Sequence, residues 1–167
     1  MGSWYNADGL YIKFDTTEGE AGKIGEYGFL TEGNVHVLEI RALDLTTLTD
    51  STQTILDQNA WLPKNARPEW VDVICTEAVT GSNAVLDLGL RKLNQSGTEF
   101  DYDGLLADAP RTDWATVGNI KRYSIGVTGA GAKLGTVLAE TGYLVATYDT
   151  AAFTDGTVNI RIGFSFP

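Results

Sequence analysis

One stretch of the sequence has the residue types and spacing of a nucleotide-binding loop. Residues 124–149 read SIGVTGAGAKLGTVLAETGYLVATYD, with an apolar run followed by Gly129, Gly131 and Gly135 and, later, by Asp149. A dinucleotide-binding fold uses such glycines to approach a pyrophosphate and a later acid to bind a ribose hydroxyl. The question is whether the surrounding elements place these residues as that chemistry requires.

The elements around the glycines argue against a nucleotide site. The dinucleotide pattern needs a helix after the glycines and a chain of alternating strands and helices. Here Gly135 and the β-branched residues 136–137 weaken a helix and suit a strand. The sequence therefore predicts a glycine-rich loop over 126–131, a strand over 133–139 and a hairpin turn over 140–142, and no cofactor.

Three acids have the spacing of a cation site. Glu99, Asp101 and Asp103 alternate, so on a strand they share one face and suit a hard cation such as calcium. Two leucines follow Gly104, where a calcium loop would supply further oxygen ligands. We expect a solvated strand edge that leads into a turn capped by Asp103, and Asp101 and Asp103 are only weak metal candidates.

Histidine and cysteine chemistry have few residues to use. His36 is the only histidine and shares the face of a predicted strand with Leu38 and Ile40, so we expect a structural role. Cys75, the only cysteine, excludes an intramolecular disulfide and a thiolate metal cluster. No Gly-x-Ser-x-Gly motif occurs. The sequence therefore predicts a non-enzymatic protein.

Five aromatic residues are candidates for binding a partner. Trp4, Tyr5 and Tyr11 gather near the N-terminus, and Trp61 and Trp70 flank a segment with two prolines. Exposed aromatics on a β-sandwich can stack on sugars or anchor a protein partner. Aromatics also fill cores and their rims, and both explanations stay open.

Charge and hydropathy exclude several classes of function. The chain has 22 acids against 12 bases, for a net charge of −10, and its bases are mostly scattered. Nucleic-acid binding needs clustered Lys and Arg, so we expect none. There is neither a signal-peptide pattern nor an apolar run long enough to span a membrane, so we expect synthesis in the cytoplasm and no membrane contact.

The pattern of apolar residues predicts strands. Apolar-rich, often alternating segments bounded by Gly, Asn, Pro or Thr occur at 9–14, 34–43, 69–79, 83–93, 142–149 and 156–166. We predict an all-β fold: a single β-sandwich domain over 1–167, jelly-roll-like, with about eight strands and one or two short helical turns. Helical turns are expected within 49–60 and 102–110.

Turn residues predict how some strands connect. The segments at 79–83 and 154–156 contain turn residues between apolar runs, which predicts two β-hairpins. Pro63 and Pro68 bracket a segment that must be a loop or the entry to a strand, because proline cannot donate a hydrogen bond within a central ladder.

The order of these segments resembles a family of proteins. In sequence they are GLYIKF, LTTLTD, LPKNARPEWVDVICTEAVTGSNAVLDLGL, DYDGLLADAP and GTVLAETGYLVATYDTAAFTDGTVNIRI. This layout resembles small virion structural proteins of tailed bacteriophages, which decorate the capsid. The resemblance implies a jelly-roll sandwich on the capsid surface of the virion, the major capsid protein as partner and a homo-oligomer, with a trimer favoured. It brings no catalytic residues.

Two hypotheses of function follow. The first is a capsid decoration or cement protein that bridges capsid subunits, with residues 1–8 as an extended N-terminal arm. The alternative is a carbohydrate-binding or adhesin module of a phage tail or surface protein, using Trp61 and Trp70 with calcium at Asp101 and Asp103. A hydrolase ranks third, because the sequence singles out no pair of carboxylates.

Overall fold

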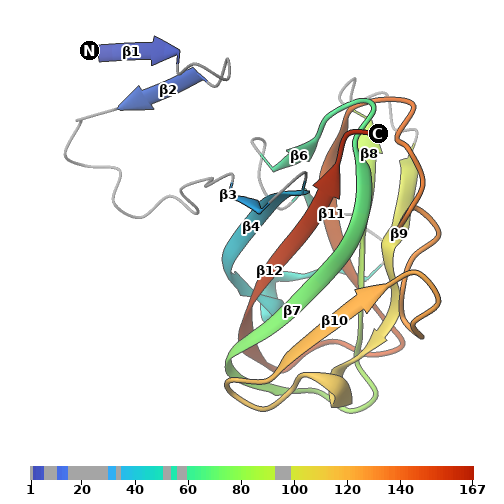
Figure 1. Ribbon diagram of the computed structural model, residues 1–167. Helices are drawn as coiled ribbons and strands as arrows, with labels where there is room; N and C mark the ends of the chain where they lie inside the picture. The colour runs from blue at the N-terminus through green and yellow to red at the C-terminus, as the bar shows by residue number, and fades with distance from the viewer. Residues whose placement is uncertain are drawn as a thin grey trace.

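The structure, a computed structural model, is mostly β (Figure 1). It describes residues 35–50, 60–92 and 101–167 with their side chains, and the backbone alone of 2–5, 11–14, 30–32, 54–55 and 99–100. The strands are β1 Gly2–Tyr5, β2 Tyr11–Phe14, β3 Leu30–Glu32, β4 Val35–Asp44, β5 Thr54–Ile55, β6 Trp61–Leu62, β7 Arg67–Thr80, β8 Val85–Lys92, β9 Glu99–Pro110, β10 Ile120–Ser124, β11 Gly142–Asp149 and β12 Asp155–Ser165. Two 3-10 turns, η1 Leu45–Thr47 and η2 Arg111–Asp113, complete the secondary structure of the residues just given. The predicted all-β fold with one or two short helical turns is confirmed.

The strands form two antiparallel sheets that face each other. One has the order β10-β7-β12-β4-β3; the other has the order β5-β11-β8-β9, with β6 beside β11. In Figure 1, β7, β10 and β12 lie in front of β8, β9 and β11. The strand pairs are nested along the sequence. The outermost pair is β4 with β12, followed by β5 with β11, β7 with β10 and, innermost, β8 with β9. This winding is that of a jelly roll. A separate two-stranded sheet contains β1 and β2.

Alternation along the strands builds the core between the two sheets. In β8, Leu86, Leu88 and Leu90 are fully buried and point inward, so Asp87 and Gly89 lie on the outer face of their sheet. Leucine, isoleucine and valine side chains of β7, β11 and β12 meet them from both sheets in one continuous cluster. Burial of these apolar side chains is the main driving force for folding.

The hairpins predicted at 79–83 and 154–156 are wrong, and within the described residues 101–167 no strand directly precedes the hairpin turn predicted at 140–142. β7 and β8 flank the turn at 79–83 but belong to different sheets, and so do β11 and β12 around 154–156. Turn residues specify that the chain reverses; they do not specify whether the next strand pairs with the previous one or crosses to the opposite sheet. Pro68 lies at the start of β7, before the segment that pairs with β10.

One predicted helical turn is wrong, and one predicted strand is absent. Residues 102–110 belong to β9, because Leu105, Leu106 and Ala109 bury against the sandwich core. Within 49–60, Thr54–Ile55 is β5, and residues 51–53 and 56–59 lie outside the described residues. Residues 133–139 form turns and bends in a long connection between β10 and β11.

The glycine-rich loop covers the free edge of β9. The backbone N–H of Ala107 donates to Gly129 at 3.0 Å, that of Gly131 donates to Leu105 at 3.1 Å, and that of Lys133 donates to Gly104 at 2.7 Å. A Cβ on Gly131 would lie 2.2 Å from the carbonyl carbon of Gly104, so only glycine permits this approach. The loop thus pairs with an edge that would otherwise be exposed, and no helix or parallel strand follows it, as a dinucleotide site would require.

Candidate functional site

Three aspartates from three strands converge on the outer face of the β5-β11-β8-β9 sheet. They are Asp87 in β8, Asp108 in β9 and Asp149 at the end of β11, and one carboxylate oxygen of each lies within 4.8 Å of the others. Asp87 is only 4% exposed, and its Oδ1 accepts a 2.7 Å hydrogen bond from the backbone N–H of Asp108. Oxygen ligands at this spacing suit a hard cation such as calcium.

The surroundings of Asp87 in this cluster bring its pKa closer to neutral pH. Burial, together with the charges of Asp108, Asp103 and Asp149, raises the pKa of Asp87 to about 6, and the hydrogen bond from the Asp108 backbone opposes this rise. The pKa of the nearby Tyr102 hydroxyl is raised mainly by the charge of Asp103. The cluster therefore offers a carboxyl that exchanges protons near neutral pH and a phenol that remains a hydrogen-bond donor.

Aromatic side chains lie on the same outer face. Trp61 in β6 is opposite Tyr143 in β11, which is opposite Arg91 in β8. Trp61 and Tyr102 are each 44% exposed. We call this surface the acidic-aromatic face, and it comprises Trp61, Tyr102, Tyr143, Asp87, Asp108 and Asp149. Such a surface offers rings for stacking and carboxylates that accept hydrogen bonds from hydroxyl or amino groups.

Trp70 lies on the opposite sheet and already has a partner. The Arg122 guanidinium lies 4.0 Å from the centre of the Trp70 ring. The same guanidinium donates to both carboxylate oxygens of Asp72, at 2.7 Å each, in a bidentate pair. Because Trp61 and Trp70 are on different sheets, one ligand cannot stack on both.

The Arg122 contacts predict a loss of stability on substitution. We expect Arg122→Ala to lower the free energy of unfolding by about 2 kcal/mol, because Asp72 is only 6% exposed and would lose both charge-assisted hydrogen bonds. Urea denaturation measures this change. In the control Arg41→Ala, Glu39 keeps Arg161 at 2.8 Å, so the expected loss is under about 0.5 kcal/mol. A loss for Arg122→Ala no larger than that of the control would contradict the prediction.

The sequence-predicted acids lie beside the cluster. Asp101 and Asp103 are neighbours on β9, and burial, followed by the contact with Asp101, raises the pKa of Asp103. Nζ of Lys133 is 3.7 Å from Oδ2 of Asp101. The side chain of Glu99 lies outside the described residues, as do those of three candidate aromatics, Trp4, Tyr5 and Tyr11.

His36 and Cys75 make packing contacts. The His36 ring stacks on Phe164 with centroids 5.4 Å apart, and meets Phe166 edge-on at 5.5 Å. Cys75 is buried, its thiol donates to the carbonyl of Glu77 at 3.0 Å, and burial raises its pKa. A buried thiol with a raised pKa is a poor nucleophile.

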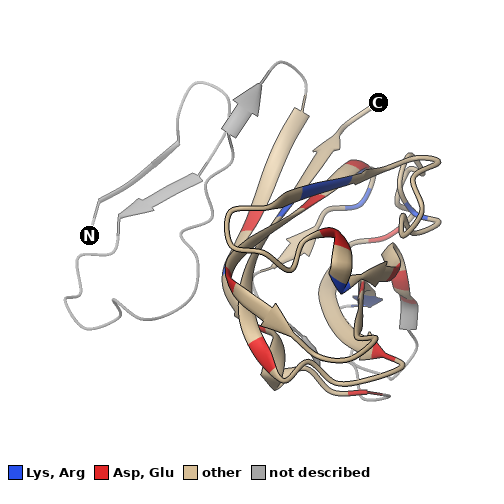
Figure 2. Cartoon of the chain, turned by 90° about the horizontal axis from the view of Figure 1, so that it is seen from below, with Lys and Arg blue, Asp and Glu red and all other residues tan. Residues whose placement is uncertain are grey.

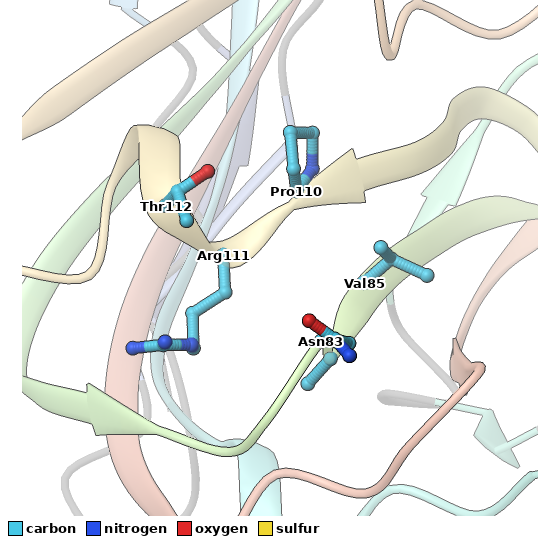
Figure 3. A pocket seen from close by; sticks show the side chains of 6 residues that line it. Asn83, Val85, Pro110, Arg111 and Thr112 are labelled. Atoms are coloured by element: carbon cyan, nitrogen blue, oxygen red, sulfur yellow. The ribbon is translucent and has the colours of Figure 1, made fainter.

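A small cavity lies at one end of the sandwich, where β9 and η2 meet the start of β8 (Figure 3). Its volume is about 320 Å³, and its lining residues are Asn83, Ala84, Val85, Pro110, Arg111 and Thr112. The Arg111 guanidinium is directed to β7, where Nη1 donates to the carbonyl of Val79 at 3.0 Å. The polar groups that remain for a ligand are the exposed Asn83 and Thr112, which define no specific chemistry.

The sequence did not predict the cluster of three aspartates, and Asp149 was considered there only as a ribose-binding acid. Asp108 and Asp149 come from distant strands, and their convergence depends on sheet order, which the sequence did not reveal. Asp87 carried no distinguishing signal, because an acid between two core leucines in VLDLGL fits the ordinary alternation of a strand with one buried face.

The fold and the acidic-aromatic face together define the chain as a jelly-roll β-sandwich with aromatic and acidic side chains on the outer face of one sheet. Acidic positions recur over its strands and loops, and basic ones are fewer (Figure 2). The part of the chain that the structure describes contains no helix with the length and apolarity to cross a bilayer. Comparisons with known protein families, with curated proteins and with solved structures find no match to this chain.

Proposed function

We propose that the chain is a non-enzymatic virion structural protein of a tailed bacteriophage, which decorates the head by binding the major capsid protein. The observation that carries the proposal is the jelly-roll winding, since the layout of segments that resembles such virion proteins implies this fold. Jelly rolls recur in viral capsid proteins, although a fold alone does not define a function.

The proposed mechanism is bridging. A homo-oligomer, with a trimer favoured, contacts several capsid subunits at once and converts modest interfaces into a high effective affinity. The bound copies then oppose separation of neighbouring subunits, which stabilises the head. The net charge of −10 keeps unbound oligomers soluble and repels them from one another.

Of the two described candidate tryptophans, Trp61 is the better placed to anchor the partner. It is 44% exposed on β6, whereas the Trp70 ring is already covered by Arg122. Large aromatics that fill a partner's pocket commonly dominate an interface. Trp4, Tyr5 and Tyr11, on the N-terminal strands, remain further contact candidates.

Binding to stripped phage particles tests the proposal. We expect the protein to co-sediment saturably with heads from which the native copies have been removed, in a fixed ratio to the capsid protein, and not with tails. Trp61→Ala is expected to weaken this binding at least about tenfold, and Trp70→Phe, which keeps a ring beneath Arg122, is expected to leave it unchanged. Binding to tails alone, or to neither particle, would contradict head decoration.

The acidic-aromatic face favours a second candidate, a carbohydrate-binding module. Its rings suit stacking on sugars, and the Asp87, Asp108 and Asp149 cluster, rather than Asp101 and Asp103, has the spacing for calcium. A glycan or calcium that binds this face should raise the melting temperature by mass action. An unchanged melting temperature across a broad glycan panel, with and without calcium, would reject this candidate.

A further inference from the structure

The described sheet edges differ in how they are covered. The edge of β4 is paired in part with β3, the edge of β11 with β5 and β6, and the edge of β9 with residues 129–133 of the glycine-rich loop. Among the described residues, no backbone hydrogen bond joins β10 to any strand except β7. An uncovered edge offers a row of unpaired N–H and C=O groups to another strand.

The pairing pattern shows which groups of β10 face outward. Cys75 in β7 exchanges hydrogen bonds with residues 118–119, just before β10. Because bonded and non-bonded pairs alternate in an antiparallel ladder, Lys121 and Tyr123 bond to β7. The N–H groups of Ile120, Arg122 and Ser124 therefore point to the free edge.

The surroundings of this edge favour strand pairing. Val117, Ile120 and Ile125 are 58%, 61% and 67% exposed in and around β10. Charged side chains commonly protect an edge strand from pairing. On β10 the Arg122 guanidinium is held over Trp70 and against Asp72, and Nζ of Lys121 lies 3.1 Å from Oδ2 of Asp113. The edge thus combines open hydrogen-bonding groups, exposed apolar side chains and two charges that already have partners in the same chain.

The N-terminal strands β1 and β2 of the same chain need a further strand to pair with. β1 and β2 hydrogen-bond only to each other among the described strands, and an isolated two-stranded sheet is marginally stable in water. Each has four residues, against five in β10. Residues 1–14 contain one acid and one base in a chain of net charge −10, so this segment approaches an acidic second copy with little repulsion.

We propose that the β1–β2 hairpin of one copy adds to the free edge of β10 in a second copy, and that this exchange forms the homo-oligomer. Residues 15–29, which connect the hairpin to β3, can span up to about 50 Å when extended, enough to reach a neighbour. The added strands would extend the sheet by main-chain hydrogen bonds, as in other cases of strand addition. The proposal concerns contacts between copies, and it stands whether or not the protein binds a phage head.

Amide hydrogen exchange of the full chain, resolved by NMR, tests this pairing. At high concentration we expect the amides of Ile120, Arg122 and Ser124 to be protected together with those of Lys121 and Tyr123. On dilution the three edge amides should exchange at least about tenfold faster, while the two that bond to β7 stay protected. Ile12→Pro, which removes a donor from β2, should abolish protection of the edge amides and shift the mass in light scattering to a monomer. Ile12→Val should preserve both.

Three results would overturn the proposal. Edge amides that exchange fast in the oligomer would show that its interface lies elsewhere. Protection that does not change with concentration would show that the hairpin pairs with β10 of its own chain. Edge amides that stay protected in Ile12→Pro would show that a segment other than the β1–β2 hairpin pairs with β10.

Discussion

Replacing Gly89 with alanine is expected to lower the free energy of unfolding by about 4 kcal/mol. A Cβ at this position would lie 2.1 Å from the carbonyl oxygen of Asp101 and 2.2 Å from the carbonyl carbon of Tyr102. Both atoms belong to the backbone of β9, which cannot rotate away as a side chain can. Relief of the clash would require β9 to separate from β8 and open the sheet that carries the acidic-aromatic face.

Urea denaturation of Gly89→Ala measures this loss, and Gly126→Ala is the matched control. Gly126 has a φ of +82° and open space around its Cβ position, so its substitution costs only the backbone strain of about 1 kcal/mol. A Gly89→Ala protein no less stable than the control would contradict the close approach of β9 to β8. NMR spectra of isotope-labelled samples of both variants would show whether the structural change is centred on β9.

Replacing Asp87 with asparagine is expected to stabilise the protein above pH 7 by about 3 kcal/mol, in the absence of divalent cations. Burial and three neighbouring aspartates raise the pKa of Asp87 from 3.8 to about 6. An asparagine at this position still accepts the hydrogen bond from the Asp108 backbone, and it adds a donor for the carboxylates of Asp108 and Asp149.

The sign of the pH dependence follows from the raised pKa. Between about pH 4 and pH 6 the folded protein holds a proton on Asp87 that the unfolded chain releases, so the free energy of unfolding falls as the pH rises. The difference in stability between Asp87→Asn and the unmodified protein should therefore grow across this window and be constant above it. The control Asp50→Asn replaces an exposed acid outside the cluster. It should change neither the free energy of unfolding above pH 7 nor its dependence on pH. A difference for Asp87→Asn that is independent of pH would contradict the assigned cause.

Much of the fold follows from the sequence because strand period is a local property. Alternation in GTVNIRIGFSF and in VLDLGLRK places one set of side chains in the core, and the structure confirms both strands. Sheet order is not local. The turns at 79–83 and 154–156 have hairpin chemistry, yet the chain crosses to the opposite sheet there, because burying β8 and β12 in the sandwich outweighs local pairing.

The glycine-rich stretch shows the same limit for function. Glycines at 129 and 131 are needed wherever a backbone must approach another closely, and here the other backbone is β9 rather than a pyrophosphate. The sequence predicted the loop at 126–131 but not that it would pair with the backbone of β9. Likewise, Asp101 and Asp103 were recognised by their spacing in the sequence, whereas Asp87, Asp108 and Asp149 meet only after three strands pair.

Electron cryo-microscopy of stripped phage heads, imaged with and without the added protein, tests the proposed decoration most directly. We expect additional sandwich-shaped density at fixed positions on the exterior, in contact with more than one capsid subunit and absent without the protein. A bare head surface at a protein concentration that saturates any binding, with density on tails or on neither particle, would contradict it.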